Sequence, residues 1–209
     1  MKVTAIILAG GKSLRLGRNK ALERILGRSL IERVVERVQP LAAQVLIVTS
    51  KEQLDLPALP GAEILTDIYP GKGPLGGIYT GLLAASYPYS IVVACDMPFL
   101  NTGLLRHMVE LCEGFDAVVP RLDNGMVEPL HAVYASSCRD EVKAQLERGQ
   151  LEVDALYGAI RVRYIEREEY QRFDPDIISF FNVNKEADLE RAFAIASRGN
   201  RNGSMSSPD

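Results

Sequence analysis

Short apolar runs rich in β-branched residues alternate with amphipathic stretches along this chain, and this alternation narrows the choice of fold more than any other feature. The runs Ile6–Leu8 and Ile91–Cys95 are apolar throughout. Strands of this kind are typical of a sheet that is covered by helices on both faces. We therefore predict an α/β fold with a single doubly wound, mostly parallel sheet and helices on both of its faces.

The predicted elements fill one domain over residues 1–197. The predicted strands are Val3–Leu8, Val45–Thr49, Ile64–Thr66, Ile91–Cys95, Ala117–Pro120, Ala132–Tyr134, Val162–Ile165 and Ile177–Phe181. The predicted helices are one that begins at the capping box Ser29–Glu32, then Gly77–Ser86, Thr102–Glu113, Ser137–Glu147 and Glu186–Ser197. Residues 198–209 are rich in Gly, Asn and Ser without an apolar period, so we predict a disordered tail.

Composition excludes several classes of function. The chain has 24 Lys and Arg against 27 Asp and Glu, a net charge of −3, which does not suit a general nucleic-acid binder. No run approaches the roughly 20 apolar residues that cross a bilayer, and the first run is too short for a secretion signal. The cysteines Cys95, Cys112 and Cys138 lack metal-ligand spacing. They fit free thiols, so we predict a cytoplasmic protein that binds neither nucleic acid nor membranes.

A glycine-rich loop follows the first predicted strand and reads Leu8-Ala9-Gly10-Gly11-Lys12-Ser13-Leu14-Arg15-Leu16-Gly17-Arg18-Asn19-Lys20. Adjacent glycines let the backbone approach a ligand and present consecutive N–H groups to an anion. Arg15 and Lys20 add two cations within reach of the same loop, which suits a triphosphate. The spacing is neither that of a P-loop nor that of a G-x-G-x-x-G dinucleotide loop.

Polar residues directly after the other predicted strands are the next candidates, because ligands of such sheets bind beyond the carboxyl ends of strands. Asp96 follows the strand Ile91–Cys95 and is placed to hold Mg²⁺ against a phosphate. Asp67 follows Ile64–Thr66, and Ser50 follows Val45–Thr49. The two histidines, His107 and His131, are interpreted as surface or core residues rather than catalysts.

These motifs together resemble the molybdenum cofactor guanylyltransferases, the MobA-type family of nucleotidyltransferases. The loop matches the pattern L-A-G-G-x-S-x-R-[ML]-G-x-x-K, and the resemblance runs from Ile6 to about Leu189. Further motifs occur in the family's order: Gly73–Ile78, Cys95–Phe99, Glu128–Leu130, Ala132–Tyr134, and Phe180–Asn184 leading to Asp188-Leu189.

The resemblance implies a Rossmann-like nucleotidyltransferase fold and transfer of GMP from GTP to molybdopterin cofactor, with Mg²⁺ and release of pyrophosphate. It implies catalytic roles for Arg15, Lys20 and Asp96, with Asp96 also as the metal ligand. It implies nucleotide binding by Leu8, Ala9, Gly10, Gly11, Lys20, Ser50, Asp67, Gly76 and Asp96. Asp67 would contact either the guanine edge or the ribose. Asn182 and Asn184 also match the family, and one of them would complete the metal or the acceptor site.

Partners are implied by the same resemblance. GTP and molybdopterin cofactor are the expected substrates, and molybdenum-insertion enzymes and apo-molybdoenzymes are the expected protein partners. Three alternatives stay open. One is use of CTP on molybdopterin, as in the related cytidylyltransferases, and a second is action on another phosphorylated small molecule. Ser50 stands where the family often has Asn and lacks the two-ended amide of Asn, so its contact with the base is left open. The third is nucleotide binding without catalysis, and the retained Arg15, Lys20 and Asp96 argue against it.

Overall fold

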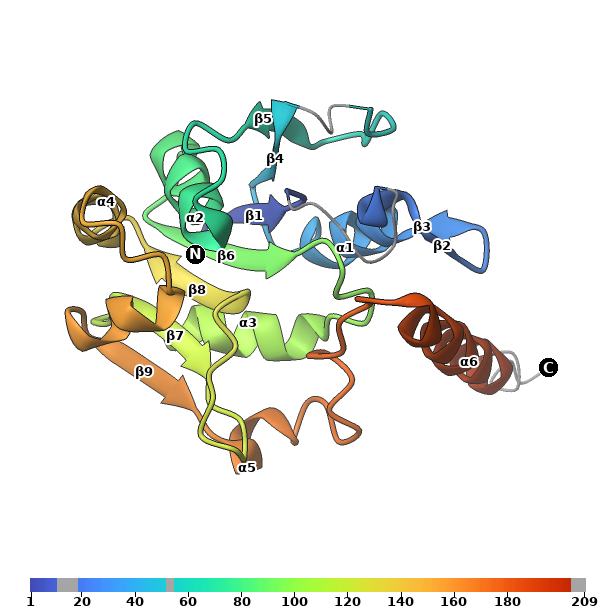
Figure 1. Ribbon diagram of the computed structural model, residues 1–209. Coiled ribbons are helices and arrows are strands. Elements are labelled where there is room, and N and C mark those ends of the chain that lie inside the picture. Colours follow the sequence, from blue (N-terminus) through green and yellow to red (C-terminus); the bar gives the residue numbers. More distant parts are fainter. Residues whose placement is uncertain (11–18, 52–54, 204–209) are drawn as a thin grey trace.

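A seven-stranded sheet forms the centre of the molecule in the computed structural model, which describes residues 1–10, 19–51 and 55–203. The strand order is β5-β4-β1-β6-β8-β7-β9 (Figure 1). In that order the strands are Glu63–Thr66, Gln44–Thr49, Thr4–Leu8, Tyr89–Ala94, His131–Ala135, Ala117–Pro120 and Val162–Ile165. Strand β8 is antiparallel to both of its neighbours, and the remaining pairings in this sheet are parallel. The prediction of a mostly parallel α/β sheet is confirmed.

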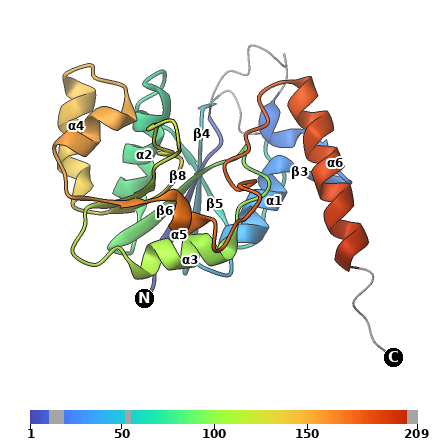
Figure 2. The same ribbon diagram turned by 90° about the horizontal axis from the view of Figure 1, so that it is seen from below.

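Helices cover both faces of this sheet, as Figure 2 shows. One face carries α1 (Leu30–Val38), α3 (Thr102–Glu110) and the short α5 (Arg167–Tyr170). The other face carries α2 (Gly73–Ala84), α4 (Cys138–Glu147) and the 3-10 helix η3 (Val153–Gly158). A further 3-10 turn, η1 (Lys20–Leu22), precedes a hairpin of β2 (Arg24–Ile25) and β3 (Arg28–Ser29), and α6 (Glu186–Gly203) lies beside that hairpin.

The two faces of the sheet build two separate parts of the core. Ile91 and Val93 of β6 belong to the cluster under α1 and α3, whereas Val92 belongs to the cluster under α2 and α4. All three side chains are fully buried. Successive residues of a strand point to opposite faces, so a strand with helices on both sides needs apolar residues at every position. For this reason, a short run of apolar residues without polar positions predicts a buried strand in this sequence.

The capping box at the start of α1 is present. The Ser29 hydroxyl accepts a hydrogen bond from the Glu32 backbone N–H at 3.4 Å, and the Glu32 carboxylate accepts one from the Ser29 N–H at 2.6 Å. These bonds satisfy N–H groups that the first turn of a helix leaves without partners. The helix then buries one apolar face of five residues, Leu30, Ile31, Val34, Val35 and Val38.

Helix α2 begins at Gly73, four residues before the start at Gly77 that the apolar pattern predicts, and the motif Gly73–Ile78 opens it, as the early position of Pro74 indicates. Pro74 fits its first turn, where a missing N–H costs nothing. The glycines of this helix let it pack closely on β1. A Cβ atom on Gly77 would lie 3.0 Å from Leu8, and one on Gly81 would overlap Ile6. The close packing holds the N-terminus of α2 near the carboxyl end of β1, where the candidate site lies.

The prediction of a strand at Ile177–Phe181 is wrong, because this segment is irregular, with a turn at Ser179 and Phe180. Ile177 has a φ of +53°, a left-handed conformation that a β-branched residue rarely adopts. Asp174 causes the bend, since its buried carboxylate accepts hydrogen bonds from the Ile178 and Ser179 N–H groups. The apolar signal arose from packing instead: Phe180 packs edge-to-face against His131 and Tyr170.

Helix α6 continues to Gly203, past the predicted end at Ser197 and into the segment predicted as a disordered tail. Propagation of a helix that has already formed needs only one further hydrogen bond per added residue. Residues 204–209 lie outside the described part of the chain.

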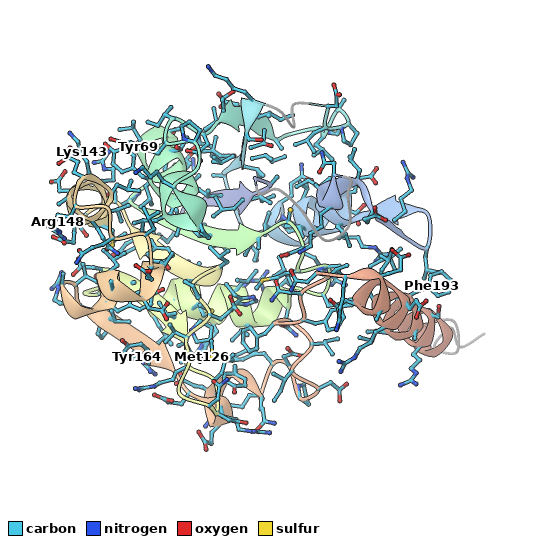
Figure 3. The ribbon with its side chains drawn as sticks, in the orientation of Figure 1. Tyr69, Met126, Lys143, Arg148, Tyr164 and Phe193 are labelled. Atoms are coloured by element: carbon cyan, nitrogen blue, oxygen red, sulfur yellow. The ribbon has the colours of Figure 1, made fainter. Side chains whose placement is uncertain are left out.

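The side chain of Phe193 on α6 is 51% exposed (Figure 3). Among the described residues, no helix is both long enough and apolar enough to span a membrane.

Candidate active site

Four parallel strands end together at one edge of the sheet, and the residues that follow them are joined by backbone hydrogen bonds. The Ala9 N–H donates to Val48 O at 2.8 Å, and the Asp67 N–H donates to Thr49 O at 2.8 Å. The Cys95 N–H donates to Leu8 O at 3.0 Å. These bonds place the ends of β5, β4, β1 and β6 side by side, so the predicted residues at 8–10, 50, 67 and 96 share this edge.

Lys20 joins three distant parts of the chain at this edge. Its Nζ donates to Asp96 Oδ2 and, at 2.7 Å, to Asn184 Oδ1. The side chains of Lys20 and Asp96 are only 16% and 17% exposed, so water screens this ion pair less than a pair on the open surface. Asn19 supports the position of Lys20, because its side chain accepts a hydrogen bond from the Ala21 N–H and caps η1.

The structure separates the two asparagines that the sequence predicted together. Asn184 contacts Lys20, as described above. Asn182 instead donates from Nδ2 to Phe180 O at 3.2 Å and stabilises a local turn. Between them, the Val183 N–H donates to Asp96 O at 3.0 Å and ties this segment to the end of β6. Asn184 is therefore the asparagine that the fold brings to the Lys20–Asp96 pair.

Asp96 has an oxygen atom that suits a cation. Its Oδ1 is buried and has no hydrogen-bond partner among the described residues. A buried carboxylate oxygen without a partner is costly unless a ligand satisfies it. Mg²⁺ is commonly held by one or two carboxylates together with phosphates of the substrate, so a single carboxylate with a nearby amide oxygen fits this ion. Residues 1–10, 19–51 and 55–203 contain no group of three His, Cys, Asp or Glu that would hold a metal unaided.

Asp67 lies at the end of β5 and is fixed by two contacts. Its Oδ1 accepts a hydrogen bond from the Tyr69 N–H at 2.9 Å and lies 2.9 Å from the Thr80 hydroxyl of α2. Gly76 permits the close approach of α2 to the turn after Asp67, since a Cβ atom there would lie 2.8 Å from Tyr69 O. These contacts give both residues a structural role, and their predicted roles in nucleotide binding stay predictions.

The remaining predicted site residues lie at the ends of β1 and β4 or outside the described part of the chain. Leu8 and Ala9 are buried, so a ligand would meet only their backbone. Gly10 is exposed and packs beside the backbone of Ser50, which is partly buried. Gly11 and Arg15 lie outside the described residues.

Glu128 lies near this site, although the sequence singled it out only as part of a motif. The pKa of its carboxyl group is raised to about 7, mainly by burial; the Leu130 N–H acts in the opposite direction, and the negative charges of Asp96 and Asp154 act in the same direction as burial. Its backbone N–H donates to Pro120 O at the end of β7. The sequence signal for Glu128 is the motif Glu128–Leu130 directly before a predicted strand. Hydrophobic periodicity does not show that this motif lies near Asp96.

The histidines and the cysteine near the site have the structural roles that the sequence predicted. His131 is fully buried on β8, and burial lowers the pKa of its imidazole to about 3. Burial raises the pKa of the Cys95 thiol to about 12, so it is not a nucleophile. His107 stacks on Phe173 and lies 3.2 Å from a Glu169 oxygen.

The neutral His131 makes a testable contribution to the pH dependence of stability. The native pKa of about 3 lies below the unfolded value of 6.5, so the unfolded chain binds the proton more readily. The contribution of His131 is complete above pH 6.5 and is lost as the pH falls toward 3. We expect the free energy of unfolding to fall by about 2–3 kcal/mol more in the wild type than in His131→Phe between pH 7 and pH 4.5. Urea titrations of both proteins at the two pH values measure this, and equal losses would contradict it.

The chain is similar to known proteins over most of its length. The family model of the MobA-like NTP transferase domain matches residues 5–162. The molybdenum cofactor guanylyltransferase of Desulfosudis oleivorans is 38% identical over 199 residues, which cover 94% of this chain and 97% of that protein. The probable molybdenum cofactor guanylyltransferase of Pelotomaculum thermopropionicum is 36% identical over 196 residues and covers 94% of each.

Solved structures agree with these matches. The molybdopterin-guanine dinucleotide biosynthesis protein A of Archaeoglobus fulgidus is 32% identical and superposes with a TM-score of 0.82, over 94% of this chain and all of that one. The 2-C-methyl-D-erythritol 4-phosphate cytidylyltransferase of Thermus thermophilus reaches a TM-score of 0.71 at 24% identity, over 94% of this chain and 100% of that one. The second likeness is one of fold alone.

Proposed function

The chain belongs to the MobA-like NTP transferase family, and from this premise we propose that it transfers GMP from GTP to molybdopterin cofactor and releases pyrophosphate. The contact of Lys20 with Asp96 and Asn184 carries the proposal. Each of these residues comes from a different motif that relates the chain to guanylyltransferases. The fold brings all three motifs to one point at the edge of the sheet.

The reaction needs charge neutralisation and alignment rather than a nucleophilic side chain. A phosphate oxygen of molybdopterin forms a bond to the α-phosphorus of GTP, and the bond from that phosphorus to the bridging oxygen breaks. The bridging oxygen leaves with pyrophosphate. Lys20 stabilises the negative charge of the triphosphate, and Arg15 is proposed to do the same. Asp96 and Asn184 hold the Lys20 ammonium group in place.

Mg²⁺ is proposed as the cofactor. Asp96 Oδ1, which has no hydrogen-bond partner within the described part of the chain, would hold the ion, and the Asn184 amide oxygen is a second candidate ligand. When bound, the ion supplies further neutralisation of the triphosphate and favours departure of pyrophosphate. The chain's own residues then orient the nucleotide. We propose that Asp67 contacts the guanine edge or the ribose. The other proposed contacts to the nucleotide come from Ser50, Gly76 and the backbone of Leu8, Ala9, Gly10 and Gly11.

Guanine selectivity is tested by comparing nucleotides directly. We expect kcat/KM for pyrophosphate release with molybdopterin to be at least about 100-fold higher with GTP than with CTP. The reason is that a carboxylate accepts hydrogen bonds from the N1–H and amino groups of guanine, a donor pattern that cytosine lacks. A reaction without molybdopterin is the control. Faster turnover of CTP would refute the guanylyltransferase assignment in favour of a cytidylyltransferase, and turnover only with another phosphorylated acceptor would refute the molybdopterin assignment.

The protein partners are a separate proposal. Molybdopterin is labile in water, so we infer that a molybdenum-insertion enzyme delivers it and that apo-molybdoenzymes receive the product in the cytoplasm. Transfer of product to a purified apo-molybdoenzyme in the presence of excess free-cofactor scavenger tests direct handover. Loss of transfer under these conditions would contradict it.

A further inference from the structure

The segment from Asp174 to Asp188, which we call the strap, crosses the end of β6 and delivers Asn184 to Lys20. Its first end is rigid. The buried Asp174 carboxylate accepts from the Ile178 N–H at 3.2 Å and from the Ser179 N–H at 2.8 Å. The Ser179 hydroxyl in turn accepts from the Asn101 N–H at 3.1 Å. The strap therefore enters the site in one fixed path.

A second carboxylate holds the far end of the strap. Asp188 Oδ2 accepts hydrogen bonds from the backbone N–H groups of Asn184, at 2.9 Å, and of Lys185, at 3.0 Å. Asp188 is the third residue of α6, so its carboxylate reaches back to the residues before the helix, as in one half of a capping box. The hydrogen bond from the Asn184 N–H to Asp188 does more than cap the helix. It holds the backbone of the residue whose side chain contacts Lys20.

We propose that Asp188 is a positioning residue for nucleotidyl transfer, acting on Lys20 through Asn184. Asn184 is exposed, so packing does not fix its side chain, and the direction of its amide depends on the backbone that Asp188 holds. Lys20 has a flexible stem of four carbons, and each acceptor that holds its ammonium group reduces the freedom that nucleotide binding must remove. The inference rests on the proposed function for its catalytic consequence.

The alternative is that Asp188 only caps α6. A cap affects the stability of the folded protein and leaves the reaction unchanged in the folded enzyme. The two roles differ in their dependence on Asn184. A positioning residue loses its effect once Asn184 has no side chain to position, whereas a cap keeps its effect on stability.

A double-mutant cycle with Asp188→Ala and Asn184→Ala tests the proposal. We expect Asp188→Ala to lower kcat/KM for GTP by about tenfold, as for the loss of a charge-assisted hydrogen bond. In the Asn184→Ala background the same change should cost less than about twofold. Asp188→Glu should retain most of the activity, because Glu is the usual residue at this position of a capping box. Glu190→Ala, which removes the same charge from an exposed position on α6, should match the wild type.

Two results with the enzyme variants in turnover and stability measurements would overturn the proposal. The first is an equal loss from Asp188→Ala in both backgrounds, and the second is a lower melting temperature with unchanged kcat/KM. A measurement without turnover keeps the test separate from the proposed function: inorganic triphosphate should bind about tenfold more weakly to Asp188→Ala than to Glu190→Ala. Unchanged binding refutes the positioning role even if the protein does not use GTP, whereas a wild type inactive with GTP refutes the function alone.

Discussion

Asp96→Asn is expected to lower kcat for pyrophosphate release on the order of 10³-fold, since groups that stabilise charge in the transition state have effects of this size. The substitution keeps the shape of the side chain and removes its charge. An amide keeps one oxygen and replaces the other by an NH2 group, so it cannot provide both the acceptor for the Lys20 ammonium group and the buried oxygen that suits a cation, and it lacks the negative charge that favours both. Release of pyrophosphate in the presence of GTP, Mg²⁺ and molybdopterin measures the effect.

Asp140→Asn is the matched control, because it makes the same chemical change at an exposed position in the first turn of α4. It should leave kcat within about twofold of the wild type. Circular dichroism and thermal melts establish that Asp96→Asn is folded. A folded Asp96→Asn protein with a kcat within tenfold of the wild type would remove Asp96 from the reacting centre.

Lys20→Met has the second-largest expected effect, a loss on the order of 10²-fold in kcat/KM for GTP. Met keeps much of the length of the side chain and loses its positive charge, so the triphosphate is less well neutralised. The substitution also leaves Asp96, which is 17% exposed, without its cation. We expect the free energy of unfolding to fall by roughly 2 kcal/mol, less than for a fully buried pair.

The kinetic and the structural effects of Lys20→Met can be separated. Isothermal titration with GTP measures the loss of binding, and urea titration measures the loss of stability. Lys2→Met, at the opposite end of β1, removes the same charge from an exposed position and should alter neither quantity. Unchanged affinity of Lys20→Met for GTP would show that Lys20 serves only as the counter-ion of Asp96.

Most of the sheet could be predicted from the sequence because its strands are buried on both faces. The run from Ile91 onward needed no knowledge of its neighbours, since apolar residues at every position require a cover on each side. The segment at Ile177 carried the same apolar signal and is irregular instead. There the decisive group is the Asp174 carboxylate, whose hydrogen bonds to later backbone groups leave no trace in hydrophobic periodicity.

The sequence predicts which residues belong to the candidate site better than it predicts which of them contact one another. Motifs indicated Lys20 and Asp96, but they did not indicate that Lys20 would contact both Asp96, 76 positions away, and Asn184, 164 positions away. The sequence likewise treated Asn182 and Asn184 as equivalent. They differ because neighbouring residues in an irregular segment point in unrelated directions, and only the fold determines which of them meets Lys20. For the same reason the proximity of Glu128 to Asp96 was not predicted.

The bridge from Lys20 to Asn184 also has a consequence for the order in which a newly made chain gains activity. The ribosome releases Lys20 early and Asn184 much later, so Lys20 first meets its full set of partners when translation has passed the strap. Contacts between such distant positions form late, because closing a long loop has a high entropic cost. The central strands can pair before then, yet no transfer is expected from such an intermediate. Guanylyl transfer by a nascent chain would thus report completion of the native fold rather than formation of its core.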